Sequence, residues 1–144
     1  MMLPMDFERM GLLLIKRGDP KRNHNDERVF ASHFGTDPDT CADAWSLLIS
    51  SDYVQDHDNN PKPEHLFFGL YSLKINKSEH VSCKFFQCDE KTYRKWSWFI
   101  IDSLSQLQFR VVSTNTFNYH VFYMFREESF LLSFCFRLNG IADL

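Results

Sequence analysis

The sequence contains few glycines and no glycine-rich loop. Only five of its 144 residues are glycine, and none stands in a spacing typical of a phosphate-binding loop. The six histidines are scattered without metal-ligand spacing, and no two of the four cysteines have the two-residue gap of a zinc knuckle or a redox motif. We therefore expect free thiols, no metal site, no cofactor and no catalytic activity.

Long apolar runs are also missing. The longest run near the N-terminus is Leu12 to Ile15, preceded by acidic residues, which is too short for a signal peptide or a membrane span. The composition is that of a globular domain, with 44% hydrophobic residues and 15 phenylalanines. We expect an intracellular protein without a membrane partner.

The net charge of −3 is unevenly distributed. Residues 29–61 contain six acids and no Lys or Arg, whereas residues 62–95 contain seven cations and four acids, a local balance of +3. Such local asymmetry bears more on the choice of partner than the total charge does.

Residues 26–108 have helical periodicity and are predicted to form one helical domain. Asp26 is expected to cap a helix over residues 27–34, and Thr36 or Asp37 a second helix through Leu48. After a polar linker over residues 51–62, a helix beginning at Pro63 has the stripe Leu66, Leu70 and Leu73, and a short helix runs from Ser78 to Phe86. Asp89 is expected to cap the longest helix, whose apolar positions are Tyr93, Trp96, Ile100, Leu104 and Leu107.

The two ends of the chain give weaker signals. Residues 1–25 are predicted to form a flexible arm, because the segment "KRGDPKRNHND" is polar and turn-rich. Residues 109–144 are rich in aromatic and β-branched residues; Val111–Val112 and Tyr119–Phe125 favour strand, so a hairpin and a further helix are the two alternatives for this tail.

The last three helices, over residues 62–108, have the long, short and long outline of a helix-turn-helix unit. In such units the first turns of the last helix lie in the DNA major groove. Here those turns contain Lys91, Thr92, Arg94 and Lys95, which are predicted to bind DNA. Arg suits guanine edges, Lys suits phosphate and Thr suits either. The alternative is an amphipathic core helix whose charges only meet solvent.

Residues 28–108 resemble the N-terminal helical region of eukaryotic Harbinger-like DDE-superfamily transposases. Three blocks carry the resemblance: "FASHFGTDPDTCADAWSLL", "PEHLFFGLYSLK" and "DEKTYRKWSWFI". Their counterparts in the family are "FxxxFGxxPxxCxxxWxLL", "PxHLLWALxFLK" and "DEKTFRKWxWxFI". The resemblance implies a mainly α module that recognises transposon ends or positions a nuclease on DNA. The family's catalytic acids lie beyond this region, and the tail has only Glu127, Glu128 and Asp143, so no nuclease triad is expected.

Two functions follow from these patterns. The first is a truncated, transposase-derived DNA-binding module in the nucleus, held together by Trp96 and Ile100 on the inner side of the last helix. The second is a protein–protein interaction module, either self-associating or binding another protein, in which Trp98 and Phe99 are expected to be exposed aromatic anchors.

Overall fold

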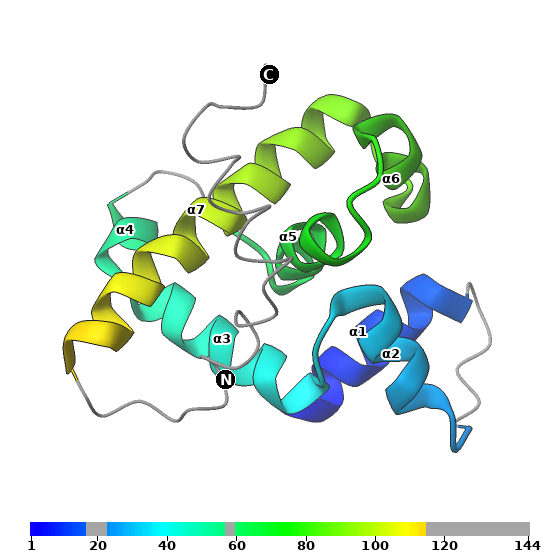
Figure 1. The fold of residues 1–144 in the computed structure, drawn as a ribbon, viewed down its shortest axis with the longest axis horizontal. Coiled ribbons are helices and arrows are strands. Elements are labelled where there is room, and N and C mark those ends of the chain that lie inside the picture. The colour runs from blue at the N-terminus through cyan, green and yellow to red at the C-terminus, as the bar shows by residue number, and fades with distance from the viewer. Residues whose placement is uncertain (17–22, 57–59, 115–144) are drawn as a thin grey trace.

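The computed structural model describes residues 1–16, 23–56 and 60–114, and these residues form seven helices and no strand (Figure 1). The prediction of a mainly α fold is therefore confirmed for this part of the chain. Residues 115–144, for which a hairpin or a further helix was expected, lie outside the described residues. The helices are α1 (Pro4–Lys16), α2 (Asp26–Phe34), α3 (Pro38–Ser50), α4 (Asp52–Gln55), α5 (Pro63–Ile75), α6 (Glu79–Phe86) and α7 (Glu90–Thr114).

Helix α5 lies at the centre of the fold and packs along α7. Seven consecutive residues of α5, His65 to Tyr71, are buried, so this helix is enclosed on nearly all sides. Gly69 lets the two helices approach closely, because a Cβ atom at this position would lie 2.4 Å from Ile100 Cγ2. The predicted stripe of α5 is confirmed for Leu66 and Leu70, which are 0% and 3% exposed.

The other helices are arranged around this pair. Helix α6 packs on the N-terminal part of α7, whereas α3 and the short α4 contact α7 further along (Figure 1). Helices α1 and α2 lie beside each other; α2 packs on α5, and α1 packs on α3. None of the helices in the described ranges is both long enough and apolar enough to cross a membrane.

The prediction of a flexible arm over residues 1–25 is wrong for Pro4–Lys16, which form α1. Phe7 is fully buried in the core and Leu12 is 5% exposed. Gly11 lies directly against the Phe30 ring, which leaves no room for a Cβ atom. The prediction gave too much weight to the polar residues 17–22 that follow the helix. The apolar face of α1 itself packs against α3 and α5.

The helix termini explain where most elements begin. Asp37 caps α3 by accepting a hydrogen bond of 2.7 Å from the Thr40 N–H group, as predicted. Asp26, however, is not the cap of α2. Its carboxylate is buried, where it accepts a hydrogen bond of 2.7 Å from the Asn23 N–H group and lies 2.5 Å from Lys16 Nζ. Asp26 therefore ties α2 to the end of α1.

Two boundaries differ from the predictions. The linker contains one helical turn, α4, which places Val54 in the core. Helix α7 continues through Val111–Val112 to Thr114, so the strand expected at these two residues is wrong. Adding a residue to an existing helix gains a hydrogen bond without a new nucleation step, which outweighs the modest β-preference of valine.

Helices α5, α6 and α7 form the predicted three-helix unit. The connection between α5 and α6 turns at Asn76, and that between α6 and α7 turns at Gln87; both residues adopt left-handed backbone conformations, with φ of 52° and 54°. These turns end the helices by reversing the backbone locally. They place the N-terminal turns of α7 beside α6.

Candidate nucleic-acid interface

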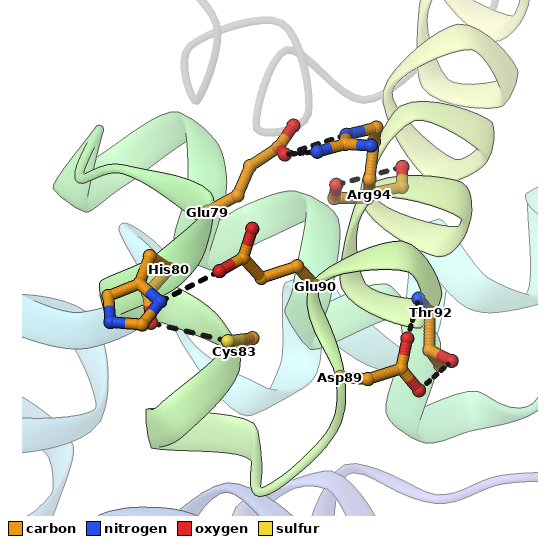
Figure 2. Close-up of polar contacts among 8 residues, drawn as sticks. Glu79, His80, Cys83, Asp89, Glu90, Thr92 and Arg94 are labelled. Carbon is orange, nitrogen blue, oxygen red and sulfur yellow. Dashed lines mark hydrogen bonds and ion pairs between the residues drawn. The ribbon is translucent and has the colours of Figure 1, made fainter.

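Helix α7 begins with a side-chain cap. The Thr92 N–H group donates a hydrogen bond of 2.8 Å to Asp89 Oδ1, and the Thr92 hydroxyl donates one of 2.7 Å to Asp89 Oδ2 (Figure 2). The hydroxyl bond and then the backbone bond lower the pKa of Asp89. Thr92 therefore stabilises the first turn of α7, and its hydroxyl group already donates its proton to an acceptor within the protein.

The first turns of α7 have one buried side and one exposed side. Tyr93 is 2% exposed and Ile100 is fully buried, which confirms the predicted inner face. With 100° between successive residues, Lys91, Arg94 and Lys95 fall within a third of the helix circumference. All three are exposed.

The two aromatic residues expected to be exposed differ from each other. Trp98 is 36% exposed and continues the face of the three cations into the next turn. Phe99 is only 8% exposed and packs within the core, so its prediction as an exposed anchor is wrong. The reason is tertiary packing, because the Phe99 ring stacks with Tyr53 of α4 and meets the Trp96 ring edge to face.

Arg94 is paired with a carboxylate of α6. Its Nε lies 2.6 Å from Glu79 Oε2, and an Nη atom lies 2.5 Å from the same oxygen (Figure 2). The hydrogen bond and the charge of Glu79 raise the pKa of Arg94 above its usual value. The Arg94 side chain remains 56% exposed, and one carboxylate oxygen occupies only part of the five N–H donors of its guanidinium group.

A second pair joins the same two helices. His80 Nδ1 of α6 lies 2.7 Å from Glu90 Oε1 of α7, and both side chains are largely exposed (Figure 2). Cys83 Sγ, one turn further along α6, donates a hydrogen bond to the His80 carbonyl oxygen. The two pairs, Glu79–Arg94 and His80–Glu90, hold α6 against the first turns of α7.

The two lysines have different surroundings. Lys91 makes no ion pair with a carboxylate of the described residues. Lys95 Nζ lies over the Trp96 ring, 4.8 Å from its centroid, a cation–π contact worth roughly 0.5–1 kcal/mol at an exposed site. Trp96 in turn stacks on His65 of α5, with ring centroids 3.8 Å apart.

The structure thus brings the four predicted site residues to the first turns of α7 and divides them into two groups. Thr92 and Arg94 are engaged by carboxylates, whereas Lys91 and Lys95 present ammonium groups to solvent. The sequence predictions missed the part played by Glu79. Its pairing with Arg94 depends on how α6 lies against α7.

The described residues offer little to nucleophilic or metal chemistry. They contain no group of three or more His, Cys, Asp or Glu side chains arranged to hold a metal ion. Three of the cysteines, Cys41, Cys83 and Cys88, have free thiols, and the fourth lies outside the described residues. Burial raises the pKa of the Cys41 thiol, with the charge of Asp37 adding to the effect, so this thiol stays protonated.

No protein-family model, no curated protein and no solved structure matches the chain. The resemblance of residues 28–108 to Harbinger-like transposases therefore stays a prediction, which rests on the three sequence blocks quoted above.

Proposed function

We propose that the chain is a DNA-binding module, derived from a transposase, that lacks a nuclease active site and acts in the nucleus. The observation that carries the proposal is the division of α7 into two sides. Tyr93 and Ile100 fix one side in the core, while Lys91, Arg94 and Lys95 occupy the exposed side of the first turns. An anchored helix that presents cations beyond its partner helices is the arrangement by which helix-turn-helix units enter the major groove.

The Glu79–Arg94 pair is compatible with this role because it is exposed. Exposed ion pairs contribute roughly 0.2–1 kcal/mol, and a phosphate oxygen is a comparable or better acceptor for a guanidinium group. We expect a phosphate oxygen to compete with Glu79 for Arg94, whose guanidinium group also has N–H donors that Glu79 leaves open. Lys91 and Lys95 have no carboxylate partner to give up, so they would make the first contacts with DNA phosphates.

A protein-interaction module remains the second candidate, and one observation favours it. Trp98 on α7 and Val81 on α6 are large apolar residues that are 36% and 44% exposed. Aromatic residues are enriched at interfaces, and the net charge of −3 disfavours a polyanionic partner. A mass that rises with concentration in light scattering, with no change on adding DNA, would favour this candidate.

The salt dependence of DNA binding separates the two functions. Fluorescence anisotropy with a labelled duplex would be recorded between about 50 and 200 mM salt, the range over which phosphate contacts change affinity most visibly. Replacing all three cations by glutamine, as Lys91→Gln, Arg94→Gln and Lys95→Gln, should reduce the slope of log K against log salt by about 2.7, because each lost phosphate contact removes about 0.9.

A control triple has the same change in charge elsewhere on the surface. Its substitutions are Arg9→Gln, Arg28→Gln and Lys74→Gln, at three exposed positions outside the first turns of α7. This control should keep the slope of the unsubstituted protein. Equal slopes for the two triples, or no DNA binding by the unsubstituted chain, would contradict the proposal.

A further inference from the structure

The side chains of His65, Trp96 and Lys95 form a line from the beginning of α5 to the exposed side of α7, and the backbone of Lys62 lies at its α5 end. The Lys62 N–H group donates a hydrogen bond of 3.0 Å to His65 Nδ1. The His65 ring stacks on Trp96 at an interplanar angle of 14°, and Lys95 Nζ lies over the Trp96 ring. Lys95 Nζ therefore lies at one end of this pair of stacked rings, and the backbone of Lys62 lies at the other.

The middle of this line is uncharged. His65 Nδ1 accepts a hydrogen bond, so this nitrogen carries no proton. Burial, and then the nearby charges of Lys62 and Lys95, together lower the pKa of His65 to about 4. Both ammonium groups thus lie close enough to disfavour a third positive charge between them.

Nearby carboxylates do not occupy the ammonium groups of Lys62 and Lys95, so both can bind a phosphate. Lys62 and Lys95 make no ion pair with a carboxylate of the described residues. Glu64 is the acidic residue of the first turn of α5, and it makes no ion pair with Lys62.

We propose that Lys62 is a further phosphate-contacting residue, so that the DNA-binding surface extends from α7 across Trp96 to the beginning of α5. This inference rests on the proposed function. In helix-turn-helix units the helices preceding the recognition helix cross the sugar–phosphate backbone at the edge of the groove. A lysine joined to α7 by a rigid aromatic stack fixes the register of the protein on this backbone, because phosphate contacts position a protein without reading bases.

The test compares Lys62, which directly precedes α5, with Lys74 near the end of this helix. Lys62→Gln should lower the slope of log K against log salt by about 0.9, and should weaken binding about eightfold at about 0.1 M salt if binding at 1 M is unchanged. Lys62→Arg should keep the slope of the unsubstituted protein, because it retains the charge. Lys74→Gln is the matched control, since Lys74 lies in the last turn of the same helix, beside Gly35 of α2. It should leave the slope unchanged.

The outcomes separate this inference from the proposed function. If the Lys91, Arg94 and Lys95 triple loses slope but Lys62→Gln does not, the extension to α5 is wrong and the α7 surface stands. If Lys62→Gln and Lys74→Gln lose slope equally, Lys62 acts only through overall charge, and the inference is overturned. If none of these variants changes the slope, both proposals fail. Thermal melts of each variant would establish that the fold is retained.

Discussion

Replacing Glu79 by glutamine should tighten DNA binding. In the free protein Arg94 shares two N–H donors with Glu79 Oε2, at 2.5 and 2.6 Å, and a phosphate must compete with this oxygen. The pair is exposed, and exposed ion pairs are generally weak. Releasing Arg94 therefore corresponds to a gain of about 1.4- to 5-fold in affinity. Glutamine keeps the size of the side chain and removes its charge.

The assay is anisotropy at fixed salt, with two comparisons. Glu27→Gln changes the net charge equally at an exposed position on α2, and should have a smaller effect. In the Arg94→Gln background the gain from Glu79→Gln should largely disappear, because the two residues act as a pair. Weaker binding by Glu79→Gln, or an equal gain in both backgrounds, would refute the competition between Glu79 and phosphate.

Two further predictions concern stability. Because the pKa of His65 is lowered to about 4 in the folded protein, the unfolded chain binds a proton more readily between pH 6.5 and 4. The free energy of unfolding should therefore fall by at most about 3 kcal/mol as the pH falls through this window. Urea titrations of His65→Gln, which keeps an acceptor for the Lys62 N–H group, should lack this component, and an equal loss in both proteins would contradict it. Gly69→Ala should lower the melting temperature, because its Cβ atom would lie 2.4 Å from Ile100 Cγ2. This clash should outweigh the gain of about 1 kcal/mol in helix propensity that alanine brings. A raised melting temperature would show that α5 and α7 are less tightly packed.

Strong periodic patterns made five of the helices predictable. The apolar positions Tyr93, Ile100 and Leu104 identified α7 and its buried side, and Asp37 and Asp89 identified helix starts through capping. These features depend on residues close in sequence, for which spacing alone determines which side chains share a face.

Helix α1 was not predicted, because the apolar stripe in its sequence is incomplete. Phe7 and Gly11 are four residues apart on one face, but a glycine adds nothing to an apolar stripe. The role of Gly11 is seen only in the structure, where its missing Cβ atom leaves room for the Phe30 ring. The end of α7 was missed for a different reason, since the β-branched residues Val111 and Val112 favour strand only where a partner strand exists.

The sequence predicts the cations of the candidate site but does not predict the residues that contact them. The cations of α7 stand together because they are adjacent in sequence. Their partners are not: Glu79 is 15 residues from Arg94, and His65 is 31 residues from Trp96. Which carboxylate meets Arg94, and which ring meets Trp96, depends on the relative placement of three helices, and local periodicity does not specify it.

The central claim is that the exposed side of the first turns of α7 contacts DNA. Amide chemical-shift mapping of the ¹⁵N-labelled full chain, titrated with a DNA duplex, tests it most directly. The account predicts that the largest shifts fall within residues 90–98 and at the beginning of α5, while α1 and α2 stay unperturbed. Saturable shifts confined to α1, α2 or α3, or no shifts at low salt, would contradict it.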